Sequence, residues 1–228
     1  MKNVKKILTL VISGLAVVGF VLCLVSSVLA VLGGGLSIIG IIVCLAAAAL
    51  EIIGLVKSVI FFISAFKADV SNWSTQKDCI RLIRSVAILL LVAGLLKVAH
   101  TTIGFIESVA RSGGAQPSDA AIERLGNNIL DGIGAFICGV FASIFVAVAV
   151  GRKSDEKPVR KVALIIGMLF VWGGVASAKG FFWFSAVGLW LFVAMGVATV
   201  VYAFFKPVKE VAAEEVAEEP AAEEPVQE

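Results

Sequence analysis

Six apolar segments, each long enough to cross a lipid bilayer, are the feature of the sequence that most constrains its fold. A helix needs about 20 predominantly apolar residues to cross a hydrocarbon layer that is about 30 Å thick. The segments are residues 7–32, 36–66, 84–107, 129–150, 162–178 and 184–205. Because lipid cannot hydrogen-bond an open backbone, each segment is expected to be helical. The sequence therefore predicts an all-α, polytopic integral membrane protein whose six transmembrane helices form three hairpins.

The composition agrees with a membrane protein and excludes several soluble classes. The chain is 60% hydrophobic and 16% charged, and its mean hydropathy is +1.03. Soluble domains, in contrast, are about half apolar and a quarter charged. The values exclude a water-soluble enzyme, a nucleic-acid binder with a basic face and a disulfide-stapled secreted module. The lipid bilayer is the expected partner, and no nucleic acid is expected to bind.

The net charge of +2 conceals two regions of opposite charge. Residues 1–209 hold all 19 Lys and Arg and 9 of the 17 Asp and Glu, whereas residues 210–228 hold 8 Glu and no basic residue. The chain is accordingly divided into a transmembrane domain, residues 1–206, and an acidic tail, residues 207–228. The tail repeats Glu, Ala and Pro without aromatic residues, a composition typical of disordered segments. It is expected either to act as a solubilising tail or to bind a basic cytoplasmic partner.

The distribution of Lys and Arg predicts the orientation of the helices, because cytoplasmic connections carry an excess of both. Basic residues gather at the N-terminus, in the second and fourth connections and after the last segment. They are Lys2, Lys5, Lys6, Lys67, Lys77, Arg81, Arg84, Arg152, Lys153, Lys157, Arg160, Lys161, Lys206 and Lys209. All of them fall on one side if both termini are cytoplasmic. We therefore expect a multi-pass protein of the cell membrane with both termini inside.

The N-terminal segment has some features of a signal peptide, with a basic start and Ala30 as a conceivable cleavage site. Its apolar run, residues 7–32, is much longer than the apolar core of a signal peptide, which has about 7 to 15 residues. A retained first helix is therefore expected.

Three ionisable side chains lie deep in the second and third segments: Glu51, Lys97 and His100. A charge at the centre of a bilayer costs at least about 2.5 kcal/mol, so each needs a physical reason. Residues 66 and 84 are the expected inner ends of the second and third segments. Counted along the helices from these ends, Glu51 and Lys97 are expected at nearly the same depth in the membrane. Both lie on helical stripes of small residues where another helix can approach closely. We therefore predict a Glu51–Lys97 ion pair with His100 and Thr101 within reach.

This predicted network has two interpretations. It could be a structural ion pair that fixes the register of a hairpin. It could also line a proton or ion path, because acids and His inside membranes change protonation during transport. Lys57, nearer the inner face, is expected to extend its ammonium group to the interface. Weaker candidates for the path are Glu107 and Asp131.

Two further patterns predict packing and anchoring. Small residues recur every four positions on the fourth segment, so another helix is expected to pack against them. They are Ala135, Gly139, Ser143, Ala147 and Gly151. Trp183, flanked by three Phe, is expected to anchor the protein at the outer membrane interface.

Residues for other site chemistry are sparse. Cys23, Cys44, Cys79 and Cys138 are isolated, without the paired spacing of a zinc or redox site. The sequence contains no phosphate-binding Gly-rich loop that ends in Lys and Ser or Thr. A single His leaves little for a hydrolytic triad. We expect no metal, no cofactor and no enzymatic activity.

The stretch His100-Thr101-Thr102-Ile103-Gly104-Phe105-Ile106 resembles a Gly-Thr-Val-x-Gly segment of the MotA/TolQ/ExbB proton-channel family. The stretch Ile129-Leu130-Asp131-Gly132-Ile133, followed by Gly139, is similar to that family's Ile-x-Glu-Ala-Leu helix. The resemblance covers about residues 95–151. It implies that Thr101 faces a pore, that Asp131 is the family's acidic residue, and that five copies surround a separate single-helix partner. Phe136 stands where the family has a second pore threonine.

Three functions are compatible with these observations. The first is a subunit of an oligomeric proton-conducting, ion-conducting or energy-coupling complex. The second is a structural or assembly subunit, a scaffold that binds partner helices as a homo-oligomer or with other membrane subunits. The third is a small-solute transporter, a class that favours broken helices. Glycines in the last two segments hint at such breaks: Gly173, Gly174, Gly188 and Gly196.

Overall fold

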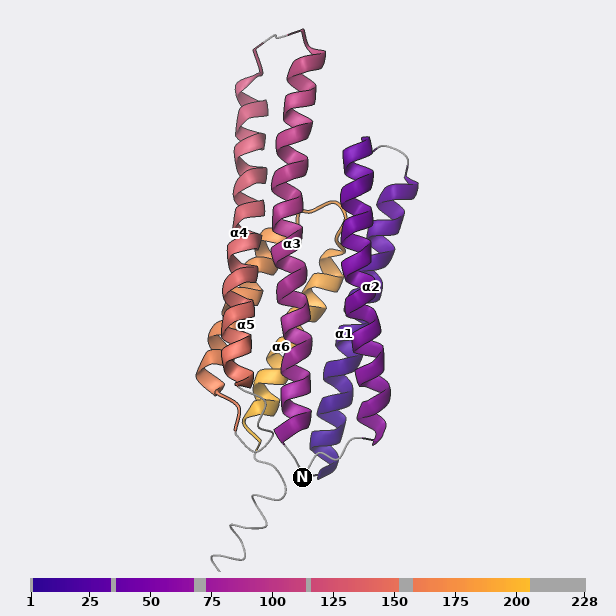
Figure 1. The fold of residues 1–228 in the computed structure, drawn as a ribbon, viewed down its shortest axis with the longest axis vertical. Helices are drawn as coiled ribbons and strands as arrows, with labels where there is room; N and C mark the ends of the chain where they lie inside the picture. The colour runs from indigo at the N-terminus through magenta and orange to yellow at the C-terminus, as the bar shows by residue number, and fades with distance from the viewer. Residues whose placement is uncertain (1, 34–35, 68–72, 114–115, 152–157, 206–228) are drawn as a thin grey trace, which may run out of the picture.

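The computed structural model describes residues 2–33, 36–67, 73–113, 116–151 and 158–205. Its helices are α1 (Lys2–Leu32), α2 (Ile38–Lys67), α3 (Trp73–Arg111), α4 (Asp119–Val150), α5 (Lys161–Ala178) and α6 (Ala186–Ala203) (Figure 1). These ranges contain no β-strand, and all six helices are long and apolar enough to cross a membrane. The predicted all-α architecture with six spans is confirmed, and the protein is a multi-pass membrane protein. The predicted acidic tail lies outside the described residues.

Helices α3 and α4 are longer than the predicted segments 84–107 and 129–150. The first turns of α3 are amphipathic: Gln76 and Ile80 are buried, whereas Arg81 is exposed, so an apolar run does not reveal them. Helix α4 begins ten residues early because the Ser118 side chain accepts a hydrogen bond from the backbone N of Ala121. Such a cap stabilises the first turn of a helix.

The length of α3 has a direct consequence for its position in a bilayer. Its 39 residues span about 58 Å at the usual helical rise, roughly twice the thickness of a hydrocarbon layer. Helix α4, with 32 residues, is also longer than a bilayer requires. The α3–α4 pair accordingly extends beyond all other helices at one end of the bundle (Figure 1).

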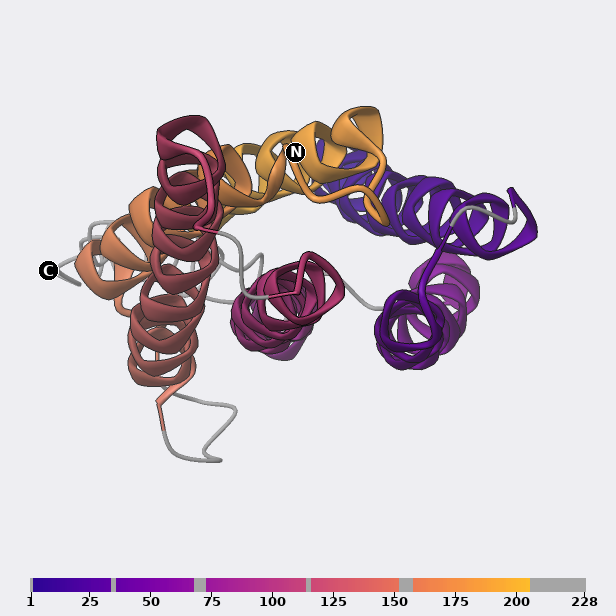
Figure 2. The same cartoon turned by 90° about the horizontal axis from the view of Figure 1, so that it is seen from above.

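The six helices form a bundle with one closed side and one looser seam. Helices α1 and α2 pack as a hairpin, and so do α3 and α4. The third pair is more open, because α5 lies mainly along α4 and α6 mainly along α1. Helices α5 and α6 thus join the two hairpins on one side (Figure 2). Contact between α2 and α3 is sparse by comparison, and the seam of the bundle lies there.

Glycines allow α3 and α4 to approach closely. A Cβ atom on Gly139 would lie 2.4 Å from the backbone N of Leu91, and one on Gly94 would lie 2.4 Å from the backbone N of Phe136. No side chain fits in so little space, so both positions need the missing Cβ of glycine.

Replacement of Gly139 by Ala is expected to destabilise the protein. The new methyl group forces the two backbones apart, and overpacking of this kind costs about 1–3 kcal/mol. The matched control is Gly104→Ala on α3, where a Cβ meets nothing within 4 Å. Thermal unfolding of the purified protein in detergent measures both. An equal melting temperature for the two variants would contradict the close packing of α3 on α4.

Candidate functional site

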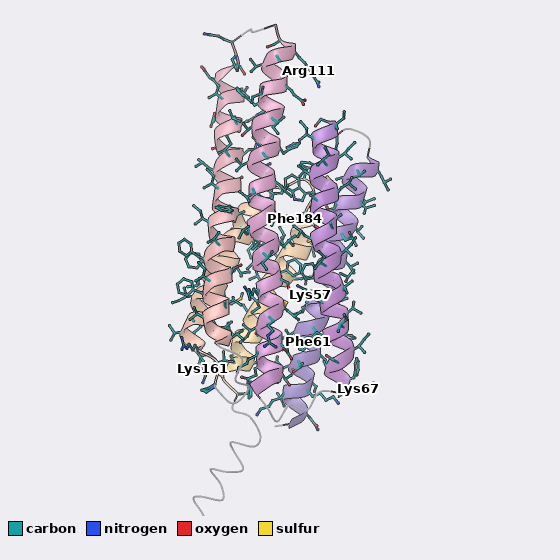
Figure 3. The ribbon with its side chains drawn as sticks, viewed as in Figure 1. Lys57, Phe61, Lys67, Arg111, Lys161 and Phe184 are labelled. Carbon is teal, nitrogen blue, oxygen red and sulfur yellow. The ribbon has the colours of Figure 1, made fainter. Side chains whose placement is uncertain are left out.

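The loop between α5 and α6, residues 179–185, is the centre of a buried cluster. The side chain of Trp183 is 0% exposed and that of Phe181 is 2% exposed. The Trp183 ring packs against Phe182 with a centroid distance of 4.6 Å and against Phe181 with a distance of 5.3 Å. The expectation that Trp183 anchors the protein in the lipid interface is therefore wrong, because the loop turns its indole ring into the bundle. Figure 3 labels Phe184 in this loop, level with the middle of α3.

Glu51 lies directly beneath this loop and is wholly buried. Its Oε1 atom lies 3.1 Å from the Ser27 hydroxyl oxygen on α1. The same hydroxyl oxygen lies 2.9 Å from the backbone oxygen of Trp183. Ser27 thus connects α1, α2 and the α5–α6 loop through two hydrogen bonds. The other carboxyl oxygen, Oε2, has no hydrogen-bond partner.

The number of hydrogen atoms available to Glu51, Ser27 and the Trp183 carbonyl determines which group donates in each contact. A backbone carbonyl only accepts, so the Ser27 hydroxyl hydrogen goes to Trp183. The contact between Ser27 and Glu51 then needs a hydrogen on the carboxyl group, because Ser27 has no second one to give. A protonated Glu51 that donates to Ser27 satisfies both contacts. A neutral acid also avoids the cost of a buried ion, which starts at about 2.5 kcal/mol at a bilayer centre.

Lys97 and His100 lie on the other side of the same loop. The Lys97 Nζ atom lies 5.3 Å from the centroid of the Phe181 ring, a cation–π contact. The His100 ring packs against Phe182 at 5.2 Å and against Trp183 at 6.3 Å. The loop therefore gathers Glu51, Lys97 and His100 around itself, and no ion pair joins Glu51 to either of the other two.

The predicted Glu51–Lys97 ion pair is wrong. Ion pairs among the described residues join Arg81 to Asp78 and Arg111 to Glu107, and neither involves Glu51 or Lys97. The carboxylate that acts electrostatically on Lys97 is Asp131 on α4.

The error in the predicted pair comes from the start of α3. Glu51 lies sixteen residues before the end of α2 at Lys67, whereas Lys97 lies twenty-four residues after the start of α3 at Trp73. This difference corresponds to about 12 Å along the helix axes. The stripe that holds Glu51 is buried, as predicted, but it packs on α1. Near the start of α2 the stripe also approaches α3, where a Cβ on Gly40 would lie 3.5 Å from the His100 Nε2 atom.

The remaining polar candidates lie outside this cluster. Thr101 is half-buried on α3 and makes no hydrogen bond through its side chain among the described contacts. Glu107 pairs with Arg111 at 3.4 Å in the projecting part of α3. Asp131 is exposed on α4. The implied pore-facing roles of Thr101 and Asp131 stay predictions.

The small-residue ridge on α4 is buried only in part. Ala135 and Gly139 are buried, whereas Ser143 and Ala147 are half-buried and Gly151 is exposed. A strict interval of four residues drifts about 40° around the helix at each step, because a turn holds 3.6 residues. The buried face alternates intervals of three and four instead, and it continues through Ala142, Val146 and Ala149.

The sequence interpretation missed the polar face of α1. Its buried residues recur at intervals of three and four. Along one stripe they are Lys5, Thr9, Ser13, Ala16, Phe20, Cys23 and Ser27, with Ile12 and Gly19 buried beside it. The signal was present, because this is the same type of stripe that identified Glu51 on the second segment.

The polar residues at the start of α1 form a second buried group. Thr9 donates to the backbone oxygen of Lys5 at 2.9 Å, and its side chain interacts with the Tyr202 hydroxyl on α6. Gln76 on α3 donates to the backbone oxygens of Tyr202 and Phe205. This second group therefore joins α1, α3 and α6.

Phe20 separates the two polar groups on α1. Its ring packs against Phe192 of α6 at 4.7 Å and fills the notch at Gly54, where a Cβ would lie 2.2 Å from the ring. The buried face of α1 is thus polar at both ends and aromatic in between.

Within the described residues, no group of three His, Cys, Asp or Glu side chains is placed to hold a metal ion. Comparison of the chain with family models, with curated proteins and with solved structures finds no match.

Replacement of Ser27 by Ala is expected to lower the free energy of unfolding by about 1–3 kcal/mol, because it leaves the Trp183 carbonyl and Glu51 buried without partners. Ser13→Ala is the matched control, since this hydroxyl is equally buried but bonds only to backbone oxygens of its own helix. Glu51→Gln is expected to keep the stability, because its amide can donate to Ser27 as a protonated acid does. Thermal unfolding in detergent compares the variants. Equal losses for Ser27→Ala and Ser13→Ala would contradict the connecting role of Ser27.

Proposed function

We propose that the protein carries protons across the membrane, alone or as a subunit of an energy-coupling complex, and that Glu51 is the group that binds and releases the proton. The observation that carries the proposal is the state of Glu51. It is a wholly buried carboxyl group with one oxygen in a hydrogen-bond chain and the other unpartnered. Ionisable groups inside membrane helices are expensive and commonly mark proton relays or ion pathways.

The buried polar residues of α1 indicate the route of the proposed proton path. Ser27 and the Trp183 carbonyl lie on one side of Phe20, and Ser13, Thr9 and Tyr202 lie on the other. Glu51 can pass its proton to the Ser27 oxygen of the first group through the existing hydrogen bond, whereas the Trp183 carbonyl only accepts a hydrogen bond. The proton can reach the second group only when the rings of Phe20 and Phe192 separate. The two rings thus act as the gate of the proposed path.

The orientation with both termini in the cytoplasm is part of the proposal. Helix α1 begins, and α6 ends, at the same end of the bundle (Figure 1). Basic residues of three other helix ends share that side, as cytoplasmic ends do. They are Lys67, Lys77, Arg160 and Lys161. The second polar group then lies at the cytoplasmic end and the α5–α6 loop faces outward. Assembly into an oligomer, which the resemblance implies, also stays a proposal.

The proposal is tested by proton uptake into vesicles that contain the purified protein, driven by a potassium diffusion potential and followed with a trapped pH-sensitive dye. The parent protein is expected to exceed protein-free vesicles, and Glu51→Gln is expected to fall to their level because a carboxamide cannot release the proton. His100→Ala is expected to retain most of the flux, since His100 contacts the loop but not the Glu51 chain.

Glu107→Gln is the control for this assay, because it removes a carboxylate on the exposed part of α3. It is expected to conduct like the parent. Background flux in the parent protein would overturn the proposal for the isolated chain, and parent-like flux in Glu51→Gln would remove Glu51 from the path.

The projecting α3–α4 pair favours a second candidate function, assembly with another protein. Helices that end well outside the bilayer present a polar surface, here with exposed Arg111, Asp119 and Glu123. Crossing the membrane does not require this extra helical length. Replacement of residues 108–122 by a short Gly-Ser linker is expected to abolish copurification of partner proteins from the native membrane while it leaves proton flux unchanged. Retention of the partners by this variant would exclude the pair as an assembly site.

The structure gives the transporter alternative no added support. Helices α5 and α6 are continuous within the described residues, and their glycines lie at close contacts. A Cβ on Gly188 would lie 2.9 Å from the backbone oxygen of Gly19, and one on Gly196 would lie 1.9 Å from the Met168 side chain. The glycines thus serve helix packing.

A further inference from the structure

A cavity of about 430 Å³ opens at the seam between α2 and α3. Lys57 and Phe61 line it from α2, and both are labelled in Figure 3 where α2 faces α3. Helix α3 contributes the remaining lining residues. They are Asp78, Arg81, Leu82, Arg84, Ser85 and Ile88. This cavity is separate from the hydrogen-bond chain of Glu51. Glu51 contacts Ser27 on α1, whereas Lys57 lines the cavity together with residues of α3.

The cavity has an excess of positive charge. Three of its side chains are cations, and Asp78 is the single acid among the lining residues. Asp78 is engaged by Arg81 in an ion pair one helical turn away. Neither Lys57 nor Arg84 is joined to an acid in the part of the chain that the structure describes. Among the described residues, these two cations therefore face the cavity without a counter-ion.

The depth of these cations makes an uncompensated state unfavourable. Lys57 lies ten residues before the end of α2, and Arg84 lies eleven residues after the start of α3. The two are thus level with each other, about 15 Å from the α2–α3 connection. Exposed charges on membrane-spanning helices are rare unless an opposite charge accompanies them.

A much smaller apolar cavity, of about 40 Å³, continues from this basic one along the same seam. It shares Lys57, Ser85 and Ile88 with the first cavity and adds Leu50, Ile53 and Leu89. Ile53 and Ile88 are exposed on α2 and α3, whereas Leu50 is half-buried and Leu89 is buried at the floor of this cavity. The seam thus combines a cationic end with an apolar groove that runs toward the middle of the membrane.

We propose that this seam binds an anionic phospholipid from the surrounding leaflet. Its phosphate lies between Lys57 and Arg84, and one acyl chain follows the groove formed by Leu50, Ile53 and Leu89. Arg and Lys side chains bind phosphate through charge-assisted hydrogen bonds, and basic pockets between transmembrane helices are suited to anionic headgroups. The apolar groove distinguishes a lipid from a free phosphate ion, which would use the cationic end alone.

The test uses the full chain, purified in a neutral detergent and titrated with dioleoyl phosphatidylglycerol, dioleoyl phosphatidylcholine or inorganic phosphate. Native mass spectrometry counts bound lipid, and the melting temperature reports stabilisation by each ligand. Phosphatidylglycerol is expected to bind and to raise the melting temperature, more weakly at high salt because screening reduces the attraction. Phosphatidylcholine and inorganic phosphate are expected to have little effect.

In the variant Lys57→Gln with Arg84→Gln, the affinity for phosphatidylglycerol is expected to fall about 20- to 30-fold, or about fivefold for each cation removed. The matched control is Arg111→Gln with Lys179→Gln, which removes the same charge from exposed positions outside the cavity lining. The charge-conserving variant Lys57→Arg with Arg84→Lys is expected to keep binding.

Three results would overturn the proposal. One is equal binding of phosphatidylglycerol and phosphatidylcholine, and another is parent-like binding by the folded double variant. The third is stabilisation by inorganic phosphate as strong as that by lipid, which would make the seam a site for a free anion. If the double variant does not fold, the headgroup preference and salt dependence of the parent protein decide the question.

Discussion

The arrangement of the protein depends on the hydroxyl group of Ser27. It binds the backbone of the α5–α6 loop and the carboxyl group of Glu51, and thereby connects α1, α2 and the loop at one point. A membrane interior supplies no water to replace either partner, so a broken link leaves a polar group unsatisfied at a cost of about 1–3 kcal/mol. The inward turn of Trp183 and its neighbours follows from this connection, since the loop carbonyl that Ser27 holds is that of Trp183 itself.

Helix α2 links the two proposed sites. Its small-residue stripe presents Glu51 to α1, and a side about 120° around the helix presents Lys57 to α3. Helices α1 and α2 pack closely, whereas α2 and α3 leave a seam that lipid can occupy. The proton site is therefore enclosed by protein, and the charged site faces the membrane. The same helix can hold both because its polar residues are divided between two faces.

The sequence predicted the number of helices and the burial of Glu51, because apolar length and small-residue spacing are local properties. It did not predict the partner of Glu51. The depth of Lys97 depends on where α3 begins, and that start is an amphipathic segment whose apolar side is visible only once α1 and α6 pack on it. The burial of Trp183 also depends on distant parts of the chain, because the aromatic cluster alone is typical of a lipid interface. Ser27 was predictable in principle, from the stripe on the first segment, but its two partners were not.

The protonation of Glu51 is tested most directly by infrared spectroscopy of the protein in lipid at neutral pH. The difference spectrum between the parent protein and Glu51→Gln isolates this carboxyl group from the ionised acids of the surface and tail. The hydrogen count at Ser27 predicts a carbonyl stretching band of a protonated carboxylic acid in the parent that is absent from the variant. A carboxylate band in its place would show that Glu51 is ionised and would contradict the hydrogen-bond chain on which this account rests.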